Sequence, residues 1–301
     1  MNTFSIILPV LLLVAAGYYL RRFELMPEEW THTLNGFVYH VALPALVVAG
    51  FWGIPWQVPG LAKLIGAGVL AFIAFALLVG ILLALTPMNR RTKASVFLAA
   101  VVGNSIYMGF PIADGAFGDG HTAVVALGTI FLVIGILIAI AGIEVFWEPE
   151  RTRAYLRSLA RNPLAIALVM GIAVGFSGWG VGGIVHQTFG IVGATASPIA
   201  LIALGAFLRG TFVRDAAWHA ALATALRLLI APVVVFLGIA LIGSRFQELG
   251  IATILAAMPV AVTTMSVADE LDLEQSVVAS SIVMSTLLAL VTVPLILLLW
   301  A

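Results

Sequence analysis

The stretch Asn104-Ser105-Ile106-Tyr107-Met108-Gly109-Phe110-Pro111 interrupts an apolar segment that is long enough to cross a membrane. Asn, Ser, Gly and Pro all weaken a helix, and Gly103 immediately before the stretch adds to this effect. Backbone that is broken at membrane depth must lie inside protein or line a watery cavity, because lipid cannot satisfy its N–H and C=O groups. The stretch therefore predicts an interrupted membrane helix with its break buried in the protein.

The composition of the whole chain agrees with a membrane environment. Of the 301 residues, 62% are hydrophobic and only 9% are charged, whereas soluble domains carry about 25% charged residues. The formal net charge is zero, so nothing indicates a nucleic-acid partner. The sequence contains no Cys, which excludes disulfides and thiolate metal sites.

Apolar segments with the length of a membrane span follow one another along the chain. They cover residues 4–20, 33–52, 61–85, 94–112, 121–144, 162–179, 186–208, 216–242, 248–268 and 275–300. Basic residues follow the first segment (Arg21, Arg22) instead of preceding it, so we interpret it as a retained span and not as a signal peptide. The sequence predicts an all-α polytopic membrane protein with ten transmembrane helices.

The distribution of basic residues predicts the orientation of these spans. The loops after the first, third, fifth and seventh spans hold 11 of the 14 Lys and Arg residues. Cytoplasmic loops carry such an excess of positive charge. We therefore expect a multi-pass protein of the cell inner (plasma) membrane with both termini on the non-cytoplasmic side.

An internal repeat divides the chain into two halves. Three pairs of segments match at offsets of 153 to 155 residues: 42–46 with 196–200, 112–114 with 267–269, and 123–126 with 276–279. Each half, 1–150 and 151–301, contains five predicted spans, and because five is odd the second half enters the membrane from the opposite side. This pattern predicts two inverted five-helix repeats, an architecture found in many secondary transporters.

The repeat mate of the first break is a second break in the ninth span. This span reads Ala256-Ala257-Met258-Pro259-Val260-Ala261-Val262-Thr263-Thr264, and Pro259 removes a backbone donor. We expect the two broken helices to cross near the membrane midplane, where the positive N-terminal ends of their second halves attract an anion.

The residues at this predicted crossover form the candidate substrate site. The predicted substrate-binding residues are Asn104, Ser105, Tyr107, Met258, Pro259, Thr263 and Thr264. Gly103 and Pro111 shape the crossover, and Pro44 and Pro198 kink the second and seventh spans. The alternative for each single residue is a packing role, since small and polar residues are common between membrane helices.

Four motifs of this chain resemble those of the auxin efflux carrier family, which includes the plant PIN carriers and their bacterial relatives. The motifs are Asn104-Ser105 through Gly109-Phe110-Pro111, Ala256-Ala257-Met258-Pro259, Arg227-Leu228-Leu229-Ile230-Ala231-Pro232 and Leu43-Pro44-Ala45-Leu46. The resemblance covers essentially the whole chain. It implies a scaffold of helices 1, 2, 6 and 7, a moving domain of helices 3–5 and 8–10, a homodimer joined through the scaffold, and transport of organic anions such as auxin, malonate or other carboxylates.

The chain departs from relatives of this family in ways that bear on mechanism. Gly103 stands where the plant members have Pro, and the long hydrophilic loop after the fifth helix is absent. Related bile-acid-type symporters use a Glu and a Gln in the ninth helix for sodium. The ninth span of this chain has neither, so we predict transport without sodium.

Three ionisable residues are candidates for a coupling or charge role. Arg227 lies inside the eighth span, where a charge is expensive and should face the protein interior; it could attract an anion, pair with an acid such as Asp114, or snorkel to the cytoplasm. His40 could carry a coupling proton or be a buried neutral residue. Asp114, with Asp119, could accept protons in an outward vestibule or lie in a solvated loop.

The sequence contains no His-Glu-x-x-His or Gly-x-Ser-x-Gly motif, so we predict no enzyme activity, no cofactor and no metal site. The predicted function is secondary active transport of small organic anions, auxin-like or mono- and dicarboxylates, by elevator-type alternating access. An uncoupled uniporter or channel for organic anions is the alternative. The predicted partners are the organic anion, membrane lipid and a second copy of the chain.

Overall fold

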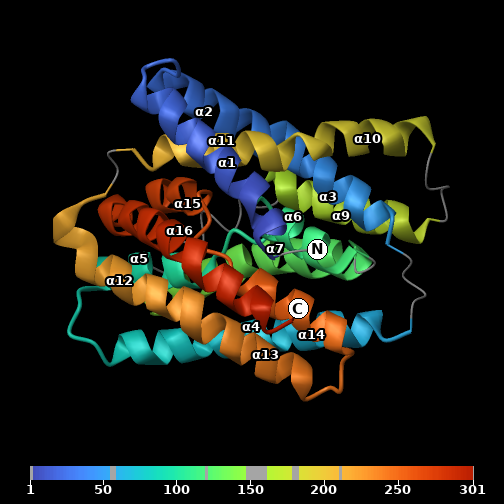
Figure 1. Cartoon of the computed structure of the whole chain (residues 1–301). Helices are drawn as coiled ribbons and strands as arrows, with labels where there is room; N and C mark the ends of the chain where they lie inside the picture. The colour runs from blue at the N-terminus through green and yellow to red at the C-terminus, as the bar shows by residue number, and fades with distance from the viewer. Residues whose placement is uncertain are drawn as a thin grey trace.

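The computed structural model describes residues 3–54, 59–118, 121–146, 161–177, 183–209 and 212–300. Asp119 and the basic residues Arg151, Arg153 and Arg157 lie outside these ranges. Within them the structure is all-helical, and the only β-type pairing is an isolated bridge. Figure 1 shows the helices running alongside one another in a layered bundle.

The helices, in chain order, are α1 (Thr3–Arg22), α2 (Glu28–Phe37), α3 (Leu43–Trp52), α4 (Leu61–Ala84), α5 (Arg90–Val101), α6 (Gly109–Phe117), α7 (His121–Phe146), α9 (Pro163–Phe176), α10 (Ile184–Ala194), α11 (Ala196–Phe207), α12 (Ala217–Ala225), α13 (Ala231–Ala240), α14 (Phe246–Ala256), α15 (Thr264–Glu270) and α16 (Gln275–Leu298). Two π-helical turns, η1 (Val38–Ala42) and η4 (Leu226–Ile230), and a 3-10 turn, η3 (Arg214–Ala216), connect some of them without a break.

Six helical runs within the described residues are long and apolar enough to cross a membrane: Glu29–Trp52, Leu61–Ala84, Leu127–Glu144, Ile184–Phe207, Arg214–Ala240 and Gln275–Leu298. Their outward faces carry large apolar side chains, such as Leu70, Leu77 and Ile81 of α4, each of which is exposed. An exposed apolar face of this kind suits contact with lipid. The chain is therefore a multi-pass α-helical membrane protein.

The helices pack as two groups. In the first group α1 packs on α11, and α3 packs on α9 and α10. In the second group α4 packs on α7 and α13, α12 on α16, α13 on α14, and α5 on α7. The first group is tightly closed, because a Cβ on Gly205 of α11 would lie 1.9 Å from the Val14 carbonyl oxygen of α1. Small residues allow membrane helices to approach this closely.

Each π-helical turn precedes a proline. Pro44 and Pro232 cannot donate to the carbonyls of His40 and Leu228, four residues earlier. The helix widens over η1 and η4 where these regular bonds are missing, and such π turns often occur at functional sites. Pro198, which the sequence predicts to be the repeat mate of Pro44, lies just after the junction between α10 and α11.

Candidate functional site

Two helices of the second group are interrupted, and their interruptions are in direct contact. The first lies between the end of α5 at Val101 and the start of α6 at Gly109, and the second between α14 and α15. Gly103 and Val260 form an antiparallel bridge. The Asn104 N–H donates to the Pro259 carbonyl at 2.7 Å, and the Ala261 N–H donates to the Val102 carbonyl at 3.1 Å. The two extended segments thus satisfy each other's backbone, and we call this paired region the crossover (residues 102–108 and 257–263).

Two of the predicted substrate ligands have structural roles in the crossover. The Ser105 hydroxyl donates to the Leu255 carbonyl at 3.1 Å, and the Thr264 hydroxyl donates to the Ala261 carbonyl at 2.6 Å. Both side chains are fully buried. Their O–H groups close helix ends and are not available as donors to a ligand.

Several backbone donors of the crossover remain unpaired. The Asn104 carbonyl accepts from Met108 and Gly109, and the Ala261 carbonyl accepts from Thr264, so each starts a helical turn. Among the described residues, no hydrogen bond is found for the backbone N–H groups at 105–107 or at 262–263. The first N–H groups of a helix are free in this way, and they point at a bound anion where one is held.

Two side-chain oxygens on the same segments also lack partners. Oδ1 of Asn104 and Oγ1 of Thr263 have no hydrogen bond within the described part of the chain. Asn104 is only 2% exposed. Buried polar atoms are nearly always paired, so unpaired ones are a feature that a ligand or water can explain.

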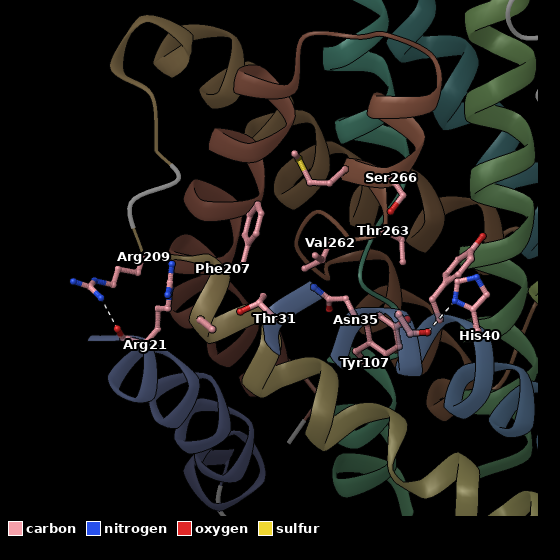
Figure 2. A pocket seen from close by; sticks show the side chains of 14 residues that line it. Arg21, Thr31, Asn35, His40, Tyr107, Phe207, Arg209, Val262, Thr263 and Ser266 are labelled. Carbon is pink, nitrogen blue, oxygen red and sulfur yellow. Dashed lines mark hydrogen bonds between the residues drawn. The ribbon is translucent and has the colours of Figure 1, made fainter. Parts of the chain in front are cut away.

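A cavity of about 500 Å³ reaches the crossover. It is lined by Arg21, Thr31, Asn35, Gly36, Tyr39, His40, Tyr107, Ala206, Phe207, Arg209, Val262, Thr263, Met265 and Ser266. Figure 2 shows Arg21 and Arg209 toward one side of the cavity, and Tyr107 and His40 toward the other. Asp and Glu are absent from the described residues that line it.

The cavity includes only part of the predicted site. Tyr107 and Thr263 line it, whereas Asn104, Met258 and Pro259 are buried behind it. Pro259 and Met258 contribute their carbonyls to bonds inside the protein. Pro111 lies in α6 and is not among the described residues that line the cavity.

The second helical run carries a polar face that was not predicted from the sequence. Thr31, Asn35 and Tyr39 recur at intervals of four residues and all line the cavity. Residues at this spacing share one face of a helix. The hydroxyl of Tyr39 accepts from Asn162 at 2.6 Å, which ties it to the start of α9. The i, i+4 spacing of polar residues in an apolar segment was the signal that could have identified this face.

For two of the three ionisable candidates, the structure contradicts one of the alternatives predicted from the sequence. His40 is exposed to the cavity and its Nδ1 donates to the Gly36 carbonyl at 2.9 Å, so the prediction of a buried histidine is wrong. Arg227 is 0% exposed, so the predicted snorkelling toward the cytoplasm is wrong as well. Asp114 is an exposed residue of α6.

Arg227 does not reach the cavity and instead contacts the opposite face of the crossover. Its Nε donates to the Met258 carbonyl at 2.9 Å and its Nη1 to the Val101 carbonyl at 3.1 Å. It has no ion pair within the part of the chain that the structure describes. The crossover therefore has one face toward the cavity and one face toward Arg227.

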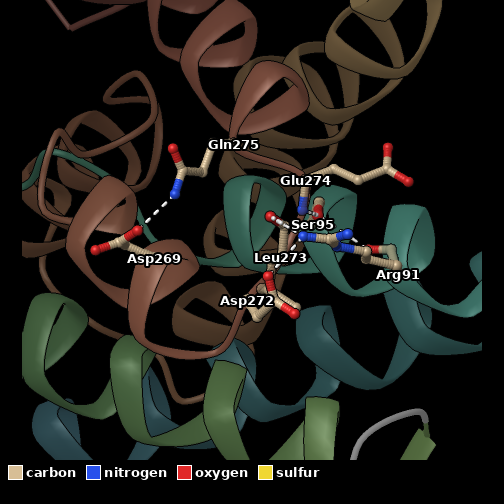
Figure 3. Close-up of polar contacts among 7 residues, drawn as sticks. All are labelled: Arg91, Ser95, Asp269, Asp272, Leu273, Glu274 and Gln275. Atoms are coloured by element: carbon tan, nitrogen blue, oxygen red, sulfur yellow. Dashed lines mark hydrogen bonds and ion pairs between the residues drawn. The ribbon is translucent and has the colours of Figure 1, made fainter.

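A polar network ties α5 to the loop that follows α15 (Figure 3). Arg91 pairs with Asp272 at 2.8 Å, and the Glu274 N–H donates to the Ser95 hydroxyl at 2.8 Å. The ion pair is more than half exposed on both sides, so it contributes at most about 1 kcal/mol. At the other end of the crossover, the Gln247 side chain of α14 donates to the Phe117 carbonyl of α6 at 2.9 Å. Each broken helix is thus tied to the other at both ends.

A group of three or more potential metal ligands does not occur among the described residues. The fold and the paired breaks therefore describe a multi-pass membrane protein with a cavity at interrupted helices. These are the features of a membrane transporter.

The chain belongs to a family of such proteins. A family model described as "Membrane transport protein" matches residues 3–297, so the predicted resemblance to the auxin efflux carrier family is confirmed. The chain is 31% identical to an "Uncharacterized transporter" of Methanothermobacter thermautotrophicus, over 98% of this chain and 97% of the relative. It is 26% identical to a protein of Rhizobium meliloti named "Putative malonate transporter", over 96% of this chain and 93% of that protein. The chain is a membrane transporter.

Proposed function

We propose that this transporter moves small organic anions by alternating access and holds them at the crossover. The observation that carries the proposal is the cavity that meets both broken helices. It brings Tyr107 and Thr263 together with unpaired backbone N–H groups, and its lining contains Arg21 and Arg209 but no acid within the described residues. A carboxylate fits this chemistry, because it is an acceptor-only group that takes several N–H and O–H donors.

The ends of the broken helices support the arrangement as ten spans in two inverted five-helix repeats. The start of α5 is tied to the segment after α15, and the start of α14 is tied to the end of α6. The two ties are related by exchanging the halves of the chain, as an inverted repeat requires. The matching segments 42–46 and 196–200 also both lie at helix junctions.

The packing supports an elevator motion of a transport domain, helices 3–5 and 8–10, past a scaffold of helices 1, 2, 6 and 7. The first packing group contains α1–α3 and α9–α11, and the second contains α4–α7 and α12–α16. The cavity lies between the groups, since Thr31, Asn35 and Phe207 come from the first and Tyr107 and Thr263 from the second. A substrate held at this boundary would move with the second group. The scaffold would join two copies of the chain as a homodimer.

The basic residues indicate the side of the membrane to which the cavity opens. Arg21, at the end of α1, and Arg209, after the end of α11, belong to the ends of spans that the charge rule assigns to the cytoplasm. This supports a cavity that opens toward the cytoplasm and termini on the non-cytoplasmic side. An anion leaving the cytoplasm would meet these two residues first. The attraction of two cations would raise the local concentration of the anion at the entrance.

Malonate is the first substrate to test, because one relative carries that substrate in its name. Purified protein would be heated with malonate, with other mono- and dicarboxylates and with indole-3-acetate, and malonamide would serve as the uncharged control. A ligand that binds only the folded state raises the melting temperature. A rise with carboxylates but not with malonamide is expected, and no rise with any carboxylate would contradict the proposed function.

Counterflow separates a carrier from a channel. Proteoliposomes loaded with unlabelled malonate should transiently accumulate labelled malonate from outside, because a carrier exchanges substrates across its alternating states. A channel or uncoupled pore gives simple equilibration and no accumulation. Equilibration alone would leave anion passage intact but reject the carrier mechanism.

A further inference from the structure

The guanidinium of Arg227 lies against the ends of both first half-helices. Val101, which accepts from Nη1, is the last residue of α5, and Met258, which accepts from Nε, follows the end of α14 at Ala256. Arg227 itself lies in the π-helical turn η4. One side chain thus binds carbonyls from two separate helices whose carboxyl ends meet at the crossover.

Gly103 allows this close approach. A Cβ on Gly103 would lie 1.8 Å from Nη2 of Arg227 and 2.2 Å from its Cζ. No other residue leaves room for the guanidinium at this distance, and the φ of Gly103 is not the reason, because it is not among the positive-φ residues of the described chain. Gly103, which stands where the plant members have Pro, has no side chain and therefore leaves the space that the Arg227 guanidinium occupies.

The charge of Arg227 is balanced by helix ends and not by an acid. The carboxyl end of a helix carries a partial charge of about −0.5, so two such ends offset about one positive charge. Within the described residues Arg227 has no acidic partner, and Nη2 has no hydrogen-bond partner at all. A buried cation without this compensation would cost several kcal/mol.

Carbonyls at the carboxyl ends of broken helices are the groups that bind a coupling cation in many secondary transporters. In this chain the same kind of groups, from both broken helices, are bonded to a side chain. We propose, building on the proposed function, that Arg227 is a tethered cation. Its guanidinium occupies the cation position of the crossover, the place where carbonyls from the carboxyl ends of both broken helices meet. It supplies the positive charge behind the substrate anion, and it makes anion binding independent of a free cation.

The wild-type protein provides the first test, with malonate as the probe. Malonate affinity should be the same in sodium chloride and in choline chloride at equal ionic strength. Radioactive sodium should show no saturable binding, with or without malonate. Malonate binding that requires sodium, or saturable binding of sodium, would overturn the proposal.

Variants of Arg227 separate charge from shape. Arg227→Gln removes the charge and should weaken malonate binding about tenfold or more. Arg227→Lys keeps the charge but not the forked donors, and should weaken malonate binding less than Arg227→Gln does. Lys63→Gln is the matched control, because Lys63 also donates to a backbone carbonyl, that of Ile242 at 2.8 Å, but at the exposed surface. Equal losses in the Gln and Lys variants would indicate a packing role only and overturn the proposal.

Two further results keep this proposal separate from the proposed function. If Arg227→Gln does not fold, the sodium measurements on the wild type decide alone. If the wild type binds no carboxylate in either salt, the proposed function fails. The assignment of Arg227 to the cation position is then tested by sodium binding alone. Sodium should then raise the melting temperature of folded Arg227→Gln and not that of the wild type, and saturable sodium binding to the wild type would still overturn the assignment.

Discussion

The two faces of the crossover differ in how far their polar groups are satisfied. On the cavity face, the N–H groups at 107 and 262–263 and the side-chain oxygen of Thr263 have no partners among the described residues. The N–H groups at 105–106 and the Oδ1 of Asn104, which are buried behind the cavity, lack partners there as well. On the opposite face, the carbonyls of Val101 and Met258 are bonded to Arg227. The same two breaks therefore present unpaired donors to the cavity and filled acceptors to the protein interior. Under the proposed function, the cavity face would hold the anion, whereas the other face is already bonded within the chain.

The largest expected effect comes from filling the space that Gly103 leaves for the Arg227 guanidinium. Gly103→Ala places a Cβ 1.8 Å from the Arg227 guanidinium and should destabilise the protein by about 3 kcal/mol or more, because overpacking and a displaced buried charge add. The melting temperature in detergent measures this. Gly66→Ala in α4 is the control, since its Cβ would meet no atom within 4 Å. Equal melting temperatures for both variants would contradict the close approach.

The next largest effect separates binding from stability on the cavity face. Asn104→Ala removes an oxygen that has no partner and should abolish malonate binding while the protein still folds and dimerises. Ser105→Ala removes the hydroxyl that donates to Leu255 and should lower stability by about 1 kcal/mol while malonate affinity remains. Melting temperature and malonate affinity are measured for both. Unchanged transport kinetics in Asn104→Ala would remove this residue from the site.

The polar side chain of Thr263 offers a sharper version of the same comparison. Thr263 lines the cavity, and Thr263→Val keeps its shape while removing a buried hydroxyl that lacks a partner. It should weaken malonate binding by about 1 kcal/mol and leave the melting temperature unchanged. Thr264→Val, at a hydroxyl bonded to Ala261, should lower the melting temperature instead. The opposite pattern would show that the two threonines have been assigned to the wrong faces.

The smallest effect is expected at the cavity entrance. Arg209→Gln removes one of the two basic residues that line the cavity and should slow malonate association a few-fold, because charges at an entrance act mainly on the rate of encounter. The melting temperature should fall only slightly, through loss of the bond that the partly buried Arg209 donates to the Arg21 carbonyl. The slowing should disappear at high salt, where exposed charges are screened. Stopped-flow binding at low and high salt measures it, and a salt-independent loss would place Arg209 in direct contact with the ligand.

The breaks could be predicted from sequence because Asn104, Gly109 and Pro259 are poor helix formers within apolar segments. The different roles of the polar residues could not be predicted from the sequence. Ser105 and Thr264 carry the same hydroxyl as Thr263, and only the fold decides which hydroxyl meets a carbonyl.

Arg227 could be predicted to lie inside the protein from the cost of its charge. Its partners could not, because Val101 is 126 positions away in the chain. The polar face of Thr31, Asn35 and Tyr39 was visible as a spacing of four residues, but these residues lie outside the four motifs that resemble the family.

An arginine that is part of the chain cannot be released with its cargo. If it serves as the cation of the crossover, it returns on every cycle, and the only net charge delivered is that of the anion itself. Each turnover would then be an electrical current, driven by about 2.3 kcal/mol per charge for every 100 mV across the membrane. In a cell with a negative interior, such a protein would discharge anions outward as long as the voltage lasts, whatever the salt outside.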